Sequence, residues 1–597
     1  LNMDAVRDMA TAGLDTVTEV PTARWDVAAQ PELPEPIASR VRHGGFLLEC
    51  SLVDNAAFGV SPAEAASMDP QQRLLLERGY SALHEAGLDR SGLNGSPTGI
   101  FLGIASNDYQ AVLASSPAGG SVYAATGSSM SIASGRLSYA LGLNGPCVSF
   151  DTACSAALSA GHTGLRAIQN AECMYGLVSG VTLMLAPGIG TSFAIAGMTS
   201  PKGRSHTFDE RADGYCRGEG CGSVALQRDV GAFAVLSLVG SAVRQDGRSA
   251  SLTAPSGPAQ QGLLVAALMD GSVASRELAL MEAHGTGTAL GDPIEAGSLV
   301  SAVLTAREIT SGPLAVGGVK ANIGHAEPAA GMTGLLKLAV CMKARDAAPN
   351  AQLRRINPHV NTTLQGTGAA LSTQLGALPE SARAGGVSSF GYSGTIAHAV
   401  LTHDPSGSDA ELPELPSLEY KRRAFPWNDR PHPFVQRRLR ESSETVFRSV
   451  ASGALESVVA HHVVQSRIIF PGAGHLEVGR AASCAVSRSE AAVLNGVFFV
   501  QPLVVDLPGL HVECAMAGGR FEVRSGELMD GALSESATHC SGDADPAAYN
   551  SVGWTCLQAA SICCEPRAVR AILSKLQGET SLHIAHCAQC HVQARCI

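Results

Sequence analysis

Charged residues are scarce in this chain of 597 residues, and basic ones are the scarcer kind. Asp, Glu, Lys and Arg make up 16% of the sequence, against 45% hydrophobic residues. Such a composition is typical of compact folded domains and excludes a disordered chain. The formal net charge of −11 argues against a nucleic acid partner, because phosphate binding needs an excess of Lys and Arg. The length allows two or more domains, each with its own core.

Signals for export or membrane insertion are also lacking. The chain begins at Leu1 without a basic segment followed by an apolar core. The uncharged stretch from Cys173 to Pro201 contains five glycines and an internal proline, which indicates buried strand and loop, not a membrane span. The 16 cysteines form no compact framework of the secreted kind, so we expect reduced thiols and a cytoplasmic protein.

One cysteine lies in a distinctive local context, the segment DTACSAAL that begins at Asp151. The apolar run Cys147–Phe150 predicts a buried strand before it, and apolar residues at helical spacing follow it. Cys154 is therefore expected at a sharp strand-to-helix turn, where the helix N-terminus favours the thiolate. A thiolate accepts acyl groups as a nucleophile. A buried, inert cysteine is the alternative interpretation.

Three later segments supply partners for such a nucleophile. MEAHGTGTALGDPIEA follows a short apolar strand and places His284 in a Gly/Thr turn. VKANIGHAEPAAG places Lys320 and His325 in a loop before a helix of small residues. SSFGYSGTIAHAV, from Ser388, is a glycine-rich turn suited to close backbone approach to a ligand. A cysteine with two loop histidines and a lysine fits nucleophilic catalysis with separate electrostatic stabilisation. Each histidine alone is also compatible with ordinary hydrogen bonding.

These segments resemble the ketosynthase domain of modular polyketide synthases and type I fatty acid synthases. Further matching motifs occur in the family's order: MDPQQRLLLERGYSALHEAG, FDERADGYCRGEGCG and QDGRSASLTAPSG. The resemblance implies an α/β thiolase-like fold of two similar halves, usually a homodimer. It covers residues 1–402, with halves at 1–230 and 231–402, and the family's first strand is missing before LDTVTEVPTARWDV. Residues 403–431, rich in proline and charge, are expected to be a linker.

The resemblance also implies roles for individual residues. Cys154 would carry the acyl chain, while His284 and His325 would hold the carbonyl of a malonyl thioester. Lys320 would order His325 through Glu327 or nearby carbonyls. The backbone N–H groups of Cys154 and Tyr392 would form an oxyanion hole. Two positions depart from the family: Tyr392 replaces the usual gate phenylalanine, and Ile396 replaces an asparagine.

The implied reaction is decarboxylative condensation by a β-ketoacyl synthase. No cofactor or metal is bound directly, because the acyl and malonyl groups arrive on the phosphopantetheine of an acyl carrier protein. An acyltransferase, which precedes the dehydratase in many modular synthases, is absent from the chain and would act in trans. Two other hypotheses about the function remain open. One is a non-elongating, decarboxylase-type subunit, although such subunits usually lack the cysteine. The other is an inactive fragment that acts as a scaffold.

Residues 432–545 resemble the first half of a polyketide dehydratase, a partial α+β hotdog domain. HHVVQSRIIFPGAGHLEVGRAA carries the family pattern, with His462 as the dehydratase-like base and Ser466 at the usual glycine position. A structural histidine is the alternative. The catalytic acid should come from a second hotdog, and neither Asp543 nor Asp545 has a context that identifies it. We therefore expect this segment to be inactive.

The remaining residues, 546–597, form a cysteine-rich tail that we expect to be divergent or disordered. Residues 540–597 hold seven of the 16 cysteines. A zinc site is conceivable by residue type, but the spacing is too compressed and a second paired cluster is missing, so no metal is expected. The candidate zinc ligands are His583, His586, Cys587, Cys590 and His591.

Overall fold

The computed structural model describes residues 3–546, apart from short gaps. The gaps are residues 22–23, 26, 28–32, 106, 115, 229–235, 308–311, 380–381, 405–414, 428–431, 441–443, 488–491, 508 and 530–531. The cysteine-rich tail, with its candidate zinc ligands, lies outside the described residues. The chain divides into two units, residues 1–20 with 33–427 and residues 21–32 with 428–597.

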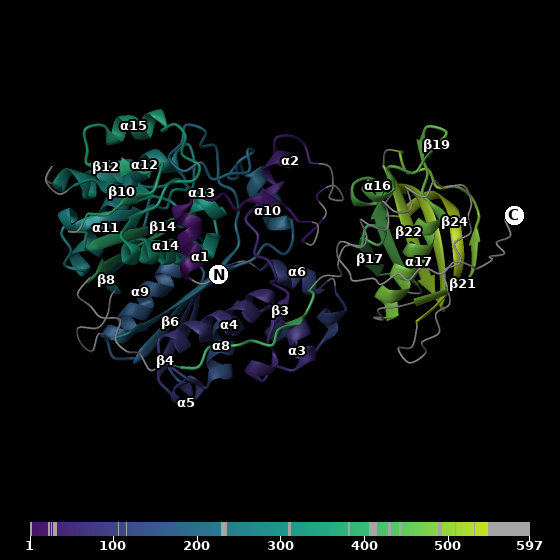
Figure 1. The fold of residues 1–597 in the computed structure, drawn as a ribbon, viewed down its shortest axis with the longest axis horizontal. Helices are drawn as coiled ribbons and strands as arrows, with labels where there is room; N and C mark the ends of the chain where they lie inside the picture. The colour runs from purple at the N-terminus through teal and green to yellow at the C-terminus, as the bar shows by residue number, and fades with distance from the viewer. Residues whose placement is uncertain are drawn as a thin grey trace. The chain divides into compact units, whose positions relative to one another are not determined.

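The first unit contains two mixed sheets with helices between them and on their outer faces (Figure 1). The sheet of the N-terminal half has the strand order β5-β4-β6-β7, in which only β7 is antiparallel to its neighbour. Its strands are β4 (Thr98–Gly103), β5 (Cys147–Phe150), β6 (Tyr175–Thr182) and β7 (Gly220–Gln227). The buried strand predicted within the uncharged stretch Cys173–Pro201 is confirmed by β6, whereas residues 188–195 of the predicted loop form a short helix, α10 (Gly188–Ile195).

The sheet of the C-terminal half has the order β12-β10-β9-β14-β15-β8. Its strands are β8 (Leu236–Gln245), β9 (Leu278–Glu282), β10 (Leu314–Gly317), β12 (Ala369–Leu371), β14 (Ala384–Phe390) and β15 (Thr395–His403). The series β5-β4-β6-β7 corresponds to β10-β9-β14-β15, since in each the last strand is antiparallel. Within the described part of the chain, the N-terminal sheet has no counterpart of β8.

Helices α9 (Ala156–Gln169) and α14 (Ala330–Ala344) lie between the two sheets and contact each other. Their small residues allow this close packing, and they share one apolar core with strands of both sheets. On the outer faces, α4 (Pro70–Glu85) and α8 (Met130–Leu141) cover the N-terminal sheet, and α11 (Gly257–Asp270) lies on β8 and β15, beside α12 (Gly291–Ala302). This α/β layering is the predicted fold class of two similar α/β halves.

Shorter elements complete the first unit. The helices are α1 (Met3–Thr11), α2 (Ile37–Arg40), α3 (Pro62–Ser67), α5 (Arg90–Leu93), α6 (Asp108–Ala114), α7 (Ala124–Ser128), α13 (Lys320–Ile323) and α15 (Pro358–Leu364). The strands are β1 (Thr18–Glu19), β2 (His43–Gly44), β3 (Leu52–Val53), β11 (Asp346–Ala347), β13 (Gly376–Ala377) and β16 (Arg423–Ala424).

Part of the expected linker packs onto the first unit. Strand β16 pairs with β3, and Phe425 and Trp427 are buried. The Arg422 side chain binds the Glu77 carboxylate at 2.8 Å. Aromatic side chains thus attach the residues up to Trp427, which the proline and charge content of the segment did not predict.

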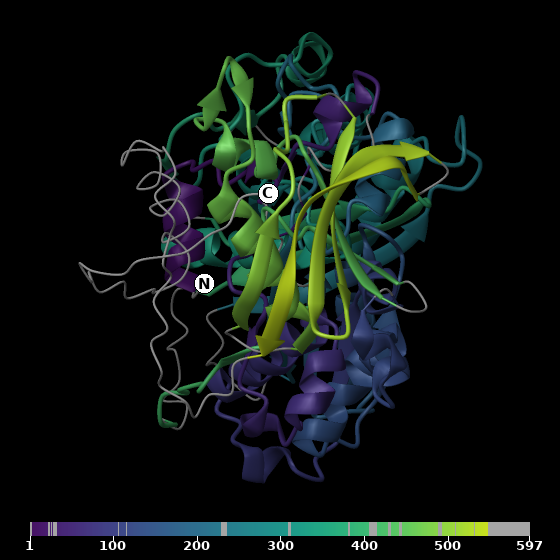
Figure 2. The ribbon, with the colours of Figure 1, turned by 90° about the vertical axis from the view of Figure 1, so that its right-hand side faces the viewer.

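The second unit is an antiparallel sheet that curves beside one long helix (Figure 2). The strand order is β17-β18-β22-β23-β24-β21, and α17 (Gly472–Ser487) packs against β21 to β24. The strands are β17 (Arg437–Arg440), β18 (Thr445–Val450), β21 (Ala492–Phe499), β22 (Leu510–Ala517), β23 (Arg520–Met529) and β24 (Ala532–Pro546). Helix α16 (Ala454–Val459) and the hairpin of β19 (Val463–Val464) and β20 (Arg467–Ile468) precede α17. This arrangement is the predicted single hotdog.

Candidate active site

Cys154 occupies a sharp turn between β5 and α9, as predicted. Ala153, directly before it, has a left-handed backbone with φ of 52°, which is uncommon for a residue with a Cβ. The Asp151 carboxylate accepts the Ala153 N–H at 3.1 Å, and the Ser389 hydroxyl donates to the Cys154 carbonyl at 2.6 Å. These contacts hold the strained turn in place and present the thiol to the interior.

The expectation that β5 is buried is wrong. Cys147 and Val148 are exposed, although the strand itself has the predicted bounds. β5 is the edge strand of its sheet, with β4 as its neighbour. Apolar composition predicts a strand but does not show whether a further strand will cover its outer edge.

The structure brings the two candidate histidines to the cysteine. His325 Nε2 lies 3.0 Å from Cys154 Sγ, across 171 residues of sequence. The ring centroids of His284 and His325 are 5.5 Å apart, with the planes nearly perpendicular. His284 follows β9, and His325 follows the short helix α13, so three separate motifs converge on one place.

Backbone N–H groups determine the tautomer of both histidines. The Glu327 N–H donates to His325 Nδ1 at 3.2 Å, and the Phe390 N–H donates to His284 Nδ1 at 3.2 Å. Because each Nδ1 accepts a hydrogen bond, the proton of a neutral ring must be on Nε2. Burial, with the positive charge of Lys320, lowers the pKa of both rings well below the usual histidine value. Both histidines are therefore neutral Nε2–H donors at physiological pH.

The acidity of Cys154 differs from the sequence-based expectation. Burial raises the pKa of the Cys154 thiol to about 12, and the Glu327 carboxylate acts in the same direction. Lys320 and hydrogen bonds from the backbone N–H groups of Tyr392 and Cys154 oppose this increase. A helix N-terminus does favour a thiolate, but here the cost of desolvating the charge is larger. The resting nucleophile is therefore a neutral thiol. When it reacts, the negative charge that develops on the sulfur faces these N–H donors.

Lys320 and Glu327 are both at the site. Lys320 begins α13, so it lies on a helical turn and not in a loop, and it is buried. Burial lowers the Lys320 pKa, and the negative charges of Glu282 and Glu295 oppose this shift. The Glu327 carboxylate is bound by Arg217, with Nε–Oε1 at 2.6 Å and Nη2–Oε2 at 3.0 Å. Lys320 therefore acts on the site through its charge, and the ion pair of Glu327 is with Arg217.

The glycine-rich turn between β14 and β15 closes the site from another side. A Cβ on Gly391 would lie 2.4 Å from the Thr152 carbonyl oxygen, so only glycine allows this approach next to Cys154. Gln245 Nε2 donates to the Ser393 carbonyl at 3.0 Å, which supports the turn where the family asparagine is replaced. Ile396 is fully buried, and Tyr392 is half-exposed with its ring edge against Phe193 at 6.1 Å.

Two residues that hold the histidine loops, Glu295 and Arg217, were not predicted from the sequence. The Glu295 carboxylate accepts the N–H groups of His284 and Gly285 at 2.7 and 2.8 Å. Arg217 holds Glu327, as described above. Both belong to the quoted motifs GDPIEA and YCRGEG, but only the buried position of their charges reveals a function, since charged side chains are rarely buried without partners.

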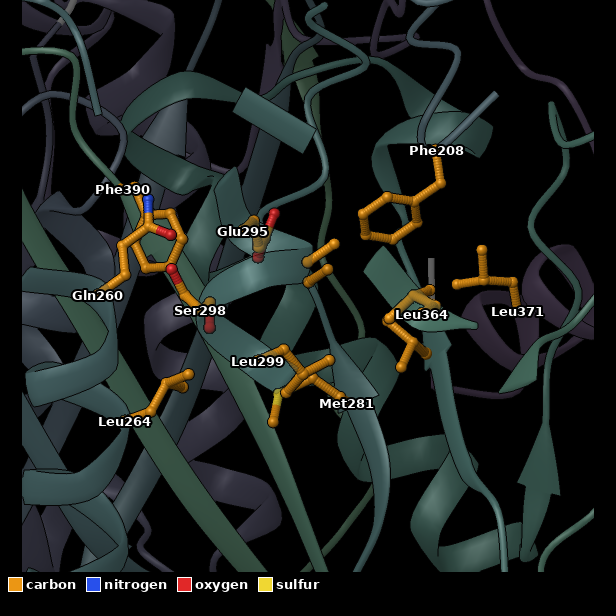
Figure 3. Close-up of a pocket in the computed structure, with 14 residues that line it drawn as sticks. Phe208, Gln260, Leu264, Met281, Glu295, Ser298, Leu299, Leu364, Leu371 and Phe390 are labelled. Carbon is orange, nitrogen blue, oxygen red and sulfur yellow. The ribbon is translucent and has the colours of Figure 1, made fainter. Parts of the chain in front are cut away.

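A largely apolar cavity lies next to Glu295 and Phe390, two residues that contact His284 (Figure 3). Glu295 and Phe390 line it, and Cys154 does not. Most of its wall is hydrophobic, with Leu264, Leu299, Met281, Phe208, Leu364 and Leu371 among the lining residues. The cavity therefore belongs to the apolar core next to the site.

In the second unit, His462 follows α16. Its Nδ1 contacts the Ile469 carbonyl at 2.6 Å. The β19–β20 turn that follows has two left-handed residues, Gln465 with φ of 50° and Ser466 with φ of 64°. A glycine would adopt this conformation without strain, so the departure at Ser466 has a structural cost.

The candidate acids of this unit lie on β24. Asp543 approaches Arg520 at 3.5 Å, and Asp545 accepts from Asn495 at 3.4 Å. Both carboxylates thus have partners on neighbouring strands. The described residues contain no helix long and apolar enough to cross a membrane. They also contain no group of three or more His, Cys, Asp or Glu side chains arranged to hold a metal ion.

A buried cysteine beside two donor histidines, between two similar α/β halves, defines a condensing enzyme of the thiolase-like class. Residues 2–232 match the β-ketoacyl synthase N-terminal domain, residues 235–354 its C-terminal domain, and residues 432–525 the polyketide synthase dehydratase domain. The chain belongs to the β-ketoacyl synthase family, as a ketosynthase of the polyketide synthase type.

Individual relatives agree with this assignment. The ketosynthase from module 6 of the bacillaene synthase of Bacillus subtilis is 33% identical, with a TM-score of 0.61, over 67% of this chain and 69% of that one. The spectinabilin polyketide synthase system protein NorC of Streptomyces orinoci is 38% identical over 82% of this chain. Polyketide synthase GfsB of Streptomyces halstedii is 41% identical over 66% of it. The matches span only 21% and 7% of these two curated relatives.

Proposed function

We propose that the first unit catalyses the decarboxylative condensation of an acyl group with a malonyl thioester, as a β-ketoacyl-[acyl carrier protein] synthase. The observation that carries the proposal is the contact of Cys154 Sγ with His325 Nε2 at 3.0 Å, beside a second histidine whose Nδ1 is also occupied by a backbone N–H. Two Nε2–H donors next to one thiol match a reaction that first stores an acyl group and then stabilises an enolate.

In the first step, Cys154 sulfur attacks the carbonyl carbon of an acyl thioester. The carrier thiol leaves with the proton that the cysteine gives up, and the acyl group stays on Cys154. The backbone N–H groups of Cys154 and Tyr392 face the sulfur, where they would stabilise the oxyanion of the tetrahedral intermediate. Lys320 adds a buried positive charge that favours this negative charge.

In the second step, a malonyl thioester occupies the same site. His284 and His325 donate from Nε2 to its thioester carbonyl, and the bond to the carboxylate breaks with release of carbon dioxide. The resulting enolate carbon attacks the acyl carbonyl on Cys154, which forms the new C–C bond and breaks the C–S bond. The Cys154 sulfur leaves as a thiolate and takes a proton from solvent to return to the neutral thiol. Neutral histidines suit this role because a donor that keeps its proton stabilises the enolate throughout the step.

The partners follow from this chemistry. Acyl and malonyl groups would arrive on the phosphopantetheine of an acyl carrier protein, with malonyl loading by an acyltransferase in trans. A homodimer that forms through the exposed edge of β5 would pair this strand with the second copy of the chain. Sedimentation analysis tests whether the chain is a dimer. The cytoplasm is the proposed location, and the ten cysteines that the structure describes are free thiols.

The experiment compares the wild-type chain with Cys154→Ala. The intact mass after incubation with an acyl thioester should show one adduct in the wild type and none in the variant. When malonyl carrier protein is then added, only the acylated wild type should release a β-ketothioester. Cys221→Ala is the matched control, because that free thiol lies on β7 of the same unit and not at the turn. An undiminished adduct in Cys154→Ala would refute the assignment. Adduct formation without a longer product would favour a non-elongating subunit, and no adduct in the wild type would favour a scaffold.

A further inference from the structure

The ion pair between Arg217 and Glu327 is a buried, two-point contact beside the catalytic centre. The Arg217 side chain is 6% exposed and that of Glu327 13%. The two guanidinium–carboxylate hydrogen bonds measure 2.6 and 3.0 Å. This geometry fixes the carboxylate in direction as well as in position, because a guanidinium fork and a carboxylate match in one plane.

Glu327 has a second contact that reaches the catalytic histidine. Its backbone is left-handed, with φ of 42°, and in this conformation its N–H donates to His325 Nδ1 at 3.2 Å. A non-glycine residue takes up such a backbone only where its surroundings impose it. The Arg217 clamp on the side chain of the same residue is the contact that can impose it.

Arg217 is also connected to His325 through the main chain. The His325 N–H donates to the Cys216 carbonyl at 2.7 Å, and the Gly218 N–H donates to the His325 carbonyl at 2.8 Å. The segment around Arg217 therefore holds both the backbone of His325 and, through Glu327, the imidazole nitrogen that faces away from Cys154.

We infer that Arg217 is a positioning residue which keeps His325 as the Nε2–H donor by clamping Glu327. Loss of the clamp would let the Glu327 backbone relax, release Nδ1, and allow the other tautomer, which has no proton to donate toward the thioester carbonyl. The inference rests on the proposed function, because the donor matters only if a carbonyl binds at that place.

The surroundings of the guanidinium leave it little freedom. Its carbon lies 5.5 Å from the centre of the Phe193 ring, and that ring contacts Tyr392 at the entrance. Asp108 and Glu327 both raise the Arg217 pKa, while burial lowers it. A lysine at this position would keep the positive charge but could not make the two-point contact, so Arg217→Lys separates geometry from charge.

A purely structural role is the competing explanation, and a matched ion pair provides the control. Arg136 binds Glu64 at 2.5 Å with side chains 8% and 25% exposed, in the N-terminal half. Arg136→Met should lower thermal stability without reaching the active site. A single substitution of Arg217 could fail to fold because it leaves the Glu327 charge buried without a partner. The double variant Arg217→Met with Glu327→Gln removes both charges of the pair and avoids this problem.

The test uses the full chain and two readouts. In histidine-selective 15N spectra, wild-type His325 should show one protonated Nε2 and one hydrogen-bonded Nδ1, and Arg217→Lys and the double variant should show a mixture of tautomers. In these variants, the kcat for carbon dioxide release from malonyl carrier protein should fall about tenfold, and KM should stay within twofold. This loss is smaller than the loss expected when a hydrogen-bond donor is removed altogether. Saturating acylation of Cys154 should persist.

The possible outcomes lead to different conclusions. An unchanged tautomer in Arg217→Lys, or equal changes in Arg136→Met, would overturn the inference. A wild-type chain that releases no carbon dioxide would instead overturn the proposed function, while the tautomer readout would still decide whether Arg217 sets the state of His325.

Discussion

Replacing Glu327 with glutamine should make Cys154 more reactive, because the carboxylate opposes the thiolate. Burial is the largest cause of the raised Cys154 pKa, and the negative charge of Glu327 comes second. Glutamine keeps the shape and the backbone N–H of residue 327 but removes the charge. The loss of this negative charge favours the thiolate, so the pKa of Cys154 should fall.

The size of the effect follows from Coulomb's law. The Glu327 carboxylate is the charge with the largest opposing effect on the Cys154 thiolate. At an effective dielectric constant near 20, a unit charge roughly 8–10 Å away is worth about 2 kcal/mol. Solvent reaches part of the Glu327 side chain, which is 13% exposed, and screens its charge, so we expect a net change of about one pKa unit, or about 1.4 kcal/mol. At any pH well below the pKa, the thiolate fraction then rises about tenfold.

The assay is alkylation of Cys154 by iodoacetamide between pH 6.5 and 9.5, followed by peptide mass spectrometry. With a thiol pKa of about 12, the wild-type rate should rise about tenfold per pH unit over this range without a plateau. Glu327→Gln should run parallel to the wild type and about tenfold faster. Glu64→Gln, which removes an Arg-paired carboxylate elsewhere, should match the wild type. A wild-type plateau near neutral pH, or an unchanged rate in Glu327→Gln, would refute this reasoning.

Three further outcomes are expected. His325→Ala should lower carbon dioxide release from malonyl carrier protein about 10²–10³-fold, while Cys154 still accepts an acyl group. Normal release in this variant would contradict the division of roles between the histidines and the cysteine. The control is His359→Ala, because His359 is an exposed histidine. Ser466→Gly should stabilise the second unit by about 0.5–1 kcal/mol in urea-dependent proteolysis, because glycine removes the strain of the left-handed turn at some cost in chain entropy; Ser466→Ala, which keeps the Cβ, should not. A 3-hydroxyacyl thioester should give no α,β-unsaturated product, because base and acid must both reach the substrate; turnover that disappears in His462→Ala would show that another chain completes the site.

Local sequence patterns predicted the elements around the site well. The strand Cys147–Phe150, the helix after Cys154, the strand before His284 and the glycine turn after Phe390 are all confirmed. Each depends on residues within a few positions of one another: apolar periodicity sets the element, and glycine or small residues set the turn. The fold class was also predictable, because ordered motifs along the chain matched one family.

Predictions that depended on neighbours far along the chain were less successful. β5 is a strand but lies at a sheet edge, so it is exposed. Cys154 was expected to be a thiolate because a helix N-terminus lies next to it, whereas burial raises its pKa. Part of the expected linker packs on the first unit through Phe425 and Trp427. Burial is set by what the rest of the chain places around a residue, and a local pattern does not contain that information.

The sequence by itself determined which reactive groups this protein has: one cysteine at a turn, two loop histidines, a lysine, and a glycine turn to approach them. Only the tertiary structure decided their states. The contact of His325 with Cys154 spans 171 residues, and that of Arg217 with Glu327 spans 110. The tautomer of each histidine depends on a single backbone N–H. Hydrogen bonding and desolvation act over a few ångströms, so they are settled when the chain folds and distant segments meet.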